Sequence, residues 1–401
     1  ALTIFLRACA RGAPGLAVAA GMVAGVAAQT KYTALLTPAV MVLYALLFHR
    51  LRLGTIAALV ACFVFAAWET LMMHRYGHSH FLYHLSGHTG LLKQHTSSLL
   101  SLIMIVGGVA PAIMLLGMAA FRVRPALVAL ASGGVLLGFA VLPHIDQDVP
   151  ARLGMPFHAN RDSLVFGFLG CLAWGTLILC GRRLCSYTPM TPRRDLNARF
   201  LILWLGLEVA GYFVLSPFPA VRRVLDIMVV STLLVGRLLA RECPAATWRV
   251  RSIVTAGIAL GVGYYVVDLQ DALAQESVAE QCAAWVGRQQ IGKGWYVGHW
   301  GFQFYAERAG LAPVVPGITR LRCDDWLVVP SARIAQQKID ISADAFRPSA
   351  TFRVDDWPPF STTSCYYGSR SPLEPLQPPR LSVTVYRVLR DVTPDKRAGK
   401  Q

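Results

Sequence analysis

Cationic side chains lie at two points of this sequence where apolar segments meet, and both could bind an anion. Lys31 occupies the short connection between two apolar runs, beside Thr30, Tyr32 and Thr33. An ammonium group there can contact a phosphate, helped by the free N–H groups that begin the next helix. A lysine that only extends its charge to the membrane surface is the alternative. The spacing leaves both interpretations open, and it makes Lys31 and Tyr32 candidate lipid-phosphate contacts.

Arg222 and Arg223 form the second cationic point. They follow a Ser-Pro-Phe-Pro turn, and the pattern predicts that they enter the next helix within its first turn, together with Asp226. Asp226 can pair one guanidinium group, and the planar fork of the other suits phosphate oxygens. Pairing inside a helical bundle is the alternative, with Glu208 of the preceding apolar run as a further partner.

A histidine-rich segment follows the third apolar run. On a helix, three of its imidazoles would share one face and could bind zinc: His80, His84 and His88. The segment has several glycines and no cysteine, so an interfacial helix whose histidines contact a lipid or sugar hydroxyl is the other interpretation. We favour that contact and predict no metal site, while a divalent metal stays an alternative.

Further charged residues are candidates for the same ligand. Arg75 and Lys93 flank the histidine segment and could contact a lipid phosphate, and Glu69 lies just before it. Asp146 and Asp148 belong to a loop rich in charge, where clustered carboxylates serve as a general base or bind a cation. Solvated loop charges have the same appearance in a sequence, and we favour that interpretation for these two residues.

Apolar runs long enough to cross a membrane separate these polar groups. About 20 apolar residues span the hydrocarbon layer as a helix, and several runs of this order contain no charged residue: 12–30, 94–121, 125–145 and 163–181. The whole chain is 55% hydrophobic and only 15% charged, which is unlike a soluble domain. The sequence therefore predicts a mainly α-helical, polytopic membrane bundle.

Arginine pairs in alternate connections predict the orientation of this bundle. By the positive-inside rule these connections are cytoplasmic, so Lys31 and the segment after Asp268 face the periplasm of a bacterial inner membrane. The net charge of +16 then suits anionic membrane lipids rather than nucleic acid. The apolar pattern predicts about nine spans, near residues 13–28, 33–49, 54–73, 99–120, 126–142, 164–181, 198–215, 221–240 and 250–268.

The composition changes after residue 268. Residues 269–390 are predicted to form a small periplasmic α/β domain, and 391–401 a disordered tail. Strands are expected at 295–300, 325–330, 351–354 and 381–389, and helices at 271–290, 302–310 and 332–338. The turn from Gly298 to Gly301 joins a strand to a helix and suits either an anion or simple packing. Cys323 and Cys365 are the preferred disulfide pair.

The start of the chain indicates a missing beginning. An apolar segment from Ala1 ends in Arg7 and Arg11, with neither an initiator Met nor a basic region before it. We expect this segment to be the cytoplasmic end of a longer helix. Residues 1–268 are then expected to be a fragment of a bundle whose N-terminal spans lie upstream.

Two membrane motifs carry a resemblance to a known family. The stretch TKYTALLTP around Lys31, after a Gly/Ala-rich helix, resembles the corresponding stretch of the GT-C glycosyltransferases that use polyprenyl-phosphate sugars, in the family 39 group of protein mannosyltransferases and the bacterial aminoarabinose transferase. SPFPAVRRV is similar to the Arg-containing start of a late span in the same group. WYVGHWGFQFYAERAG is similar to the tail of bacterial members with a periplasmic α/β domain.

This resemblance implies a membrane glycosyltransferase. Such an enzyme passes a sugar from a polyprenyl-phosphate donor to a hydroxyl of an acceptor glycan, lipid or protein, with inversion and with a carboxylate as base. The family's base is an Asp in the first external loop, which would precede Ala1, so the resemblance assigns no catalytic residue here. It carries over Lys31, and Arg222 or Arg223, as phosphate contacts.

Two other classes of function remain open. A transporter or lipid flippase would show inverted repeats around a midplane site, whereas the charges here gather at the outer edge. A noncatalytic membrane scaffold that displays its tail domain would not need Lys31 or Arg223.

Overall fold

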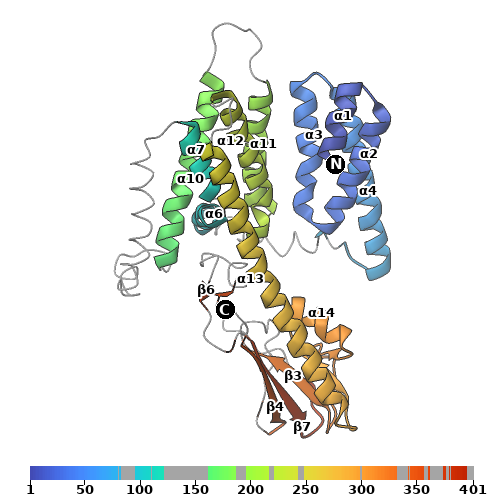
Figure 1. Cartoon of the computed structure of the whole chain (residues 1–401). Coiled ribbons are helices and arrows are strands. Elements are labelled where there is room, and N and C mark those ends of the chain that lie inside the picture. Colours follow the sequence, from blue (N-terminus) through green and yellow to red (C-terminus); the bar gives the residue numbers. More distant parts are fainter. Residues whose placement is uncertain are drawn as a thin grey trace. The chain divides into compact units, whose positions relative to one another are not determined.

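The computed structural model describes residues 1–79, 81–82, 95–109, 111–121, 161–186, 196–215, 221–242, 248–298, 300–331, 342, 344–355, 360–361, 374–375, 379 and 381–394. The described chain is mainly helical, with a small β-sheet region near its C-terminal end (Figure 1). Its contacts define two compact units: residues 1–259 belong to the first, and the second begins at Leu260.

The first unit begins with four helices and a short 3-10 turn, which lie side by side in Figure 1. Glycines let two of these helices approach closely, because a Cβ at Gly25 would meet the Ala61 carbonyl and the Val64 side chain. Buried alanines line the rest of the contact. The elements are α1 (Leu2–Arg11), α2 (Pro14–Thr30), η1 (Tyr32–Leu35), α3 (Leu36–Leu47) and α4 (Leu51–Tyr76).

Five further helices and a second 3-10 turn follow in the described part of this unit, before the helix that leads into the second unit. Two of the helices touch through glycine backbones, because a Cβ on Gly107 would collide with the Phe166 carbonyl and one on Gly170 with the Ile103 carbonyl. The elements are α6 (His95–Val109), α7 (Pro111–Ala120), α10 (Arg161–Ser186), α11 (Leu196–Leu215), η4 (Val221–Arg223) and α12 (Leu225–Glu242).

Several helices are long and apolar enough to cross a membrane. Among the helices that the structure describes, four pass by length and composition, or five if the bent pair α6 and α7 is one span. Two shorter apolar helices, Pro14–Thr30 and Tyr32–Leu47, coincide with the first two predicted spans. The prediction of about nine spans is therefore confirmed only in part within the described ranges, and the expected span 126–142 lies outside them.

Local chemistry explains two of the differences from the predicted spans. α6 and α7 meet at 78°, and Pro111, which begins α7, cannot donate a backbone hydrogen bond to the preceding turn. The expected span 221–240 is divided into η4 and α12. Charged residues at both ends of α12, such as Asp226 and Arg241, shorten its apolar stretch.

One helix, α13 (Trp248–Gly287), runs through the boundary between the two units. The predicted last span and the predicted amphipathic helix at 271–290 are thus parts of one uninterrupted helix of 40 residues. At about 1.5 Å per residue, a helix of this length is about 60 Å long, roughly twice the hydrocarbon thickness. Its C-terminal part packs into the second unit through Ala274, Val278 and Cys282.

The second unit contains a five-stranded mixed sheet in the order β2-β1-β3-β7-β4. β1 is parallel to both its neighbours, whereas β7 is antiparallel to β3 and β4. The predicted strands near 295, 326, 351 and 381 are confirmed, as is the helix after β1. The elements are β1 (Gly294–Tyr296), α14 (Trp300–Arg308), β2 (Ala312–Pro313), β3 (Trp326–Pro330), β4 (Phe346–Val354) and β7 (Leu381–Val388), with the small pair β5 (Phe360–Ser361) and β6 (Glu374–Pro375).

Alternating side chains give this sheet two buried faces. Val383 and Val385 of β7 lie in one cluster with Tyr296, and α13 and α14 contribute its helical side. Leu327 of β3 and Val388 of β7 belong to the cluster on the other face. Tyr296 and Phe302 are fully buried, so the aromatic residues between 295 and 305 belong in part to the core. This agrees with the packing interpretation of the turn from Gly298 to Gly301.

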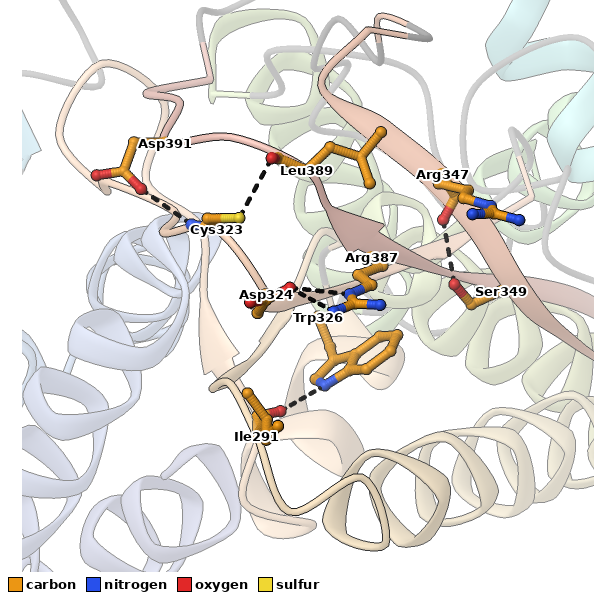
Figure 2. A network of polar contacts seen from close by, with 9 residues as sticks. All are labelled: Ile291, Cys323, Asp324, Trp326, Arg347, Ser349, Arg387, Leu389 and Asp391. Atoms are coloured by element: carbon orange, nitrogen blue, oxygen red, sulfur yellow. Dashed lines mark hydrogen bonds and ion pairs between the residues drawn. The ribbon is translucent and has the colours of Figure 1, made fainter.

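Only one cysteine of the preferred disulfide pair is among the described residues. Cys323 is a free thiol, and Figure 2 shows its sulfur directed to the Leu389 carbonyl, at 3.2 Å, while its N–H donates to Asp391. Cys365 lies outside the described residues. Beside this contact, Arg387 donates two hydrogen bonds to Asp324 and the Trp326 indole donates to the Ile291 carbonyl (Figure 2).

Replacing Gly170 by Ala should destabilise the first unit. A methyl group there collides with the α6 backbone, and forced overpacking costs about 1–3 kcal/mol. The measurement is thermal unfolding of the purified chain in detergent. Gly175→Ala is the matched control, because nothing lies within 4 Å of a Cβ at that position of the same helix. Equal melting temperatures for both variants would contradict this packing.

Acid should weaken the second unit through Glu307. The Tyr296 hydroxyl donates to Glu307 at 2.6 Å, and this bond, with one from Gln303, lowers the pKa of Glu307 below its ordinary value of 4.5. A lowered carboxylate pKa stabilises the fold above that ordinary value, and the contribution is lost as the pH falls below it.

The comparison is between the unaltered chain and Glu307→Gln, by hydrogen exchange of the α14 amides. At pH 7 the variant should exchange faster, and near pH 3 the two should converge. Asp355→Asn, which alters an exposed carboxylate directly after β4, is the control that should exchange like the unaltered chain at both pH values. A difference for Glu307→Gln that persists unchanged in acid would be inconsistent with this explanation.

Candidate functional site

Lys31 forms the corner between α2 and η1. Its backbone is extended, with φ −156° and ψ 118°, and its N–H closes the last turn of α2 on Ala27. Successive side chains of extended backbone point to opposite sides. Lys31 and Tyr32 are therefore directed to different neighbours, and the corner has two sides.

On the first side, Lys31 meets the second cationic point of the sequence. Its Nζ donates a hydrogen bond of 2.6 Å to the Arg222 carbonyl of η4, 191 residues away in the chain. Arg222, Arg223, Asp226 and Glu208 all act electrostatically on the Lys31 ammonium group. The structure thus brings together both cationic points that the sequence singled out.

The arginines enter this side in a different way from the predicted one. Arg222 and Arg223 lie in the 3-10 turn η4, and α12 begins only at Leu225. Asp226 is consequently the residue in the first turn of α12, where a carboxylate is favoured by the helix dipole. Arg222 is exposed and Arg223 is partly buried. Two guanidinium groups and one ammonium group are thus gathered around this corner.

Glu208 is a buried carboxylate of α11 on the same side. Only 8% of the residue is exposed, and its Oε1 accepts a hydrogen bond of 2.8 Å from the Trp204 indole one turn earlier. The Trp204 ring also lies against Phe200, with the ring centroids 5.5 Å apart. Trp204 was not among the predicted site residues, although its spacing of four from Glu208 was a signal for this contact.

On the second side, Tyr32 packs against α4. Its ring meets Phe65 and Phe81 edge to face, with centroids 6.2 and 5.1 Å away. Glu69, one turn after Phe65, acts electrostatically on Tyr32. The Glu69 carboxylate accepts hydrogen bonds from the Ser79 hydroxyl and the Phe81 N–H, at 2.7 and 3.1 Å. Sequence reasoning missed Ser79, which has no spacing that relates it to Glu69.

An open apolar cavity of about 630 Å³ lies among the elements that follow the corner and α11. Leu35, the first lining residue in the sequence, is four residues after Lys31. Leu207, the last one, directly precedes Glu208. At about 1.5 Å per residue, the lining from Pro38 to Leu46 follows α3 for about 12 Å. The lining residues come from η1, α3, α4 and α11: Leu35, Pro38, Ala39, Val42, Leu43, Leu46, Ala58, Cys62, Leu203 and Leu207.

Among the other predicted contacts, Arg75 alone is described. It lies in the last turn of α4, with its guanidinium 5.8 Å from the centre of the Tyr76 ring. The remaining residues lie outside the described part of the chain: His80, His84, His88, Lys93, Asp146 and Asp148. Within the described ranges, no group of three or more His, Cys, Asp or Glu residues could hold a metal ion.

No family model, curated protein or solved structure matches this chain.

Trp204→Phe should destabilise the first unit, because it removes the indole donor to a buried carboxylate while keeping an aromatic ring beside Phe200. Loss of such a donor costs about 1–3 kcal/mol. Thermal unfolding in detergent measures the effect. Trp248→Phe is the control, since Trp248 is 73% exposed and should tolerate the change. An unchanged melting temperature for Trp204→Phe would show that this bond does not stabilise the fold.

Proposed function

We propose that this chain is a membrane glycosyltransferase that takes a sugar from a polyprenyl-phosphate donor and transfers it to an acceptor hydroxyl on the periplasmic side. The observation that carries the proposal is the gathering of three basic residues at one corner, together with an apolar cavity whose lining begins four residues after Lys31. Lys31, Arg222 and Arg223 supply charge for a phosphate, and the cavity that begins at Leu35 suits a hydrocarbon chain.

The cationic side of the corner supports binding of the phosphate. Three basic groups act together there, against the carboxylates of Asp226 and Glu208. Guanidinium forks match phosphate oxygens, and an ammonium group adds a mobile point charge. The Lys31 ammonium already donates to one carbonyl, and its remaining protons can reach a bound anion.

The cavity supports a lipid rather than a free phosphate compound. Its lining residues are apolar, and each buried CH₂ group of a chain contributes about 0.8 kcal/mol to binding. A phosphate at the corner would place the first carbons of its chain beside Leu35 and Leu207. A soluble phosphate ester would leave this apolar surface unused.

In the proposed transfer, the oxygen of the acceptor hydroxyl attacks the anomeric carbon of the sugar while the bond from that carbon to the phosphate oxygen breaks. The phosphate keeps the electron pair, and the hydroxyl proton passes to a carboxylate base, which we do not assign. Positive groups around the phosphate stabilise the charge that it gains. This is the role of Lys31, Arg222 and Arg223 in the proposal.

Lys31→Ala and Arg223→Ala should each abolish sugar transfer and weaken binding of polyprenyl phosphate. A charge-assisted hydrogen bond contributes about 1.5–3 kcal/mol, equivalent to about a tenfold to hundredfold change in Kd. Binding is measured on the full chain in phospholipid nanodiscs, and transfer with a radiolabelled sugar donor. Arg52→Ala, an exposed arginine at the start of α4, is the control.

Undiminished binding and turnover in both variants would contradict the proposal. Energy-independent exchange of the intact lipid between the leaflets, without release of sugar, would instead favour a flippase. Membrane insertion of each variant is checked by alkaline extraction, so that a failure to insert is not mistaken for a loss of binding.

Filling the cavity should separate the two parts of the ligand. Ala39→Phe places a ring among the lining residues and should weaken binding of a long-chain polyprenyl phosphate. Binding of inorganic phosphate to the cationic corner, measured by competition, should be unchanged. Ala67→Phe puts the same ring at an exposed position of α4 that is not part of the lining. If both variants bind the long chain equally well, the cavity does not hold it.

A further inference from the structure

The Glu69 carboxylate faces the Lys31 corner from its aromatic side. Glu69 and Phe65 are four residues apart on α4, so they lie on the same side of the helix. Phe65 packs against Tyr32, and Glu69 acts electrostatically on Tyr32. Lys31 is directed to η4 instead. The corner therefore presents a cationic group on one side and a carboxylate on the other.

The two oxygens of this carboxylate have different surroundings. Oε2 accepts hydrogen bonds from the Ser79 hydroxyl and the Phe81 N–H, which hold the segment after α4 against the helix. Oε1 is shielded from solvent and has no hydrogen-bond partner in the described part of the chain. Burying a carboxylate oxygen costs free energy unless the oxygen accepts a hydrogen bond. A bound molecule with a hydroxyl hydrogen would satisfy it.

The aromatic rings beside Glu69 indicate what kind of molecule this is. Phe81 packs edge to face against Tyr32 and Phe65, with centroids 5.1 and 5.6 Å away. Small-molecule sites combine such aromatic surfaces with a few placed polar groups. A sugar ring offers both apolar C–H faces and hydroxyl donors. A phosphate would be repelled by the carboxylate, which leaves the phosphate to the cationic side.

We propose that Glu69 is a sugar-binding residue, whose Oε1 accepts a hydrogen bond from a ring hydroxyl of the sugar on the phosphorylated lipid. The inference rests on the proposed function, because the phosphate at Lys31 places the sugar at the corner. It adds a specificity role on α4 to the phosphate contacts on η4. Glu69 would distinguish the sugar-loaded lipid from the bare lipid phosphate.

The test compares the affinities of the full chain in nanodiscs for bare polyprenyl phosphate and for polyprenyl phosphates that carry mannose, glucose, galactose or arabinose. The unaltered protein should bind one sugar form more tightly than the bare lipid. Glu69→Gln keeps a carbonyl for Ser79 and Phe81 but puts an NH₂ group, which cannot accept a hydrogen bond, in place of Oε1. It should weaken binding of the sugar form about tenfold to hundredfold, the cost of a lost charge-assisted bond, and leave binding of the bare lipid unchanged.

Thr70→Ala is the matched control, because Thr70 is the exposed neighbour of Glu69 on α4 and its hydroxyl donates to the Ala66 carbonyl of the same helix. It should keep the preference for the sugar form. An undiminished preference in Glu69→Gln, or an equal loss in Thr70→Ala, would overturn the role of Glu69 while the phosphate site stands. No binding of any of these lipids by the unaltered protein would instead sink the proposed function, and this inference with it.

Discussion

The hydrogen bond from Lys31 to the Arg222 carbonyl is the contact on which the candidate site depends. It joins the corner after α2 to the turn before α12, and these two residues are 191 positions apart in the sequence. A cation held by a carbonyl keeps its charge, so the contact orders the ammonium group without neutralising it. The charges of Arg222, Arg223, Asp226 and Glu208 act around this one group.

The extended backbone of Lys31 gives the site its two sides. A helical residue at this position would place Lys31 and Tyr32 about 100° apart around one axis, whereas an extended residue sends them in opposite directions. Lys31 is thereby directed to η4 and Tyr32 to α4. A single residue outside regular helix separates a cationic environment from an aromatic one that contains a carboxylate.

Close helix packing keeps the neighbouring elements in place. Gly25 allows α2 to approach α4, the helix that carries Phe65 and Glu69. In a bundle with apolar surroundings, small residues and interhelical contacts hold helices together, because burial of apolar surface adds little. Gly21 and Gly25 of α2 serve this packing, and Gly107 and Gly170 serve the contact between α6 and α10.

The two units differ in how their helices and strands are stabilised. The sheet of the second unit buries aliphatic and aromatic side chains on both faces, and its ion pairs, such as Arg387 with Asp324, are exposed to solvent. The first unit leaves large apolar side chains exposed along several helices, for example Phe63 and Ile258. That distribution is what a lipid environment around the first unit would require.

Apolar runs and strand alternation determined much of this protein from its sequence alone. The positions of α2, α4, α10 and α11 and the main strands follow from periodicity, which is a local property. Lys31, Arg222 and Arg223 stood out because charge beside an apolar run is costly wherever the chain goes. The continuity of α13 was not evident, because a change of composition does not break a helix.

Tertiary structure decided which of these groups meet. No local pattern relates Lys31 to a carbonyl 191 residues later, or Ser79 to Glu69, since backbone carbonyls and loop hydroxyls carry no spacing signal. The cavity beside Leu35 likewise exists only because η1, α3, α4 and α11 surround one space. Sequence determined the elements and the candidate charges, whereas long-range packing determined their partners, because contacts between distant segments depend on how the whole bundle closes.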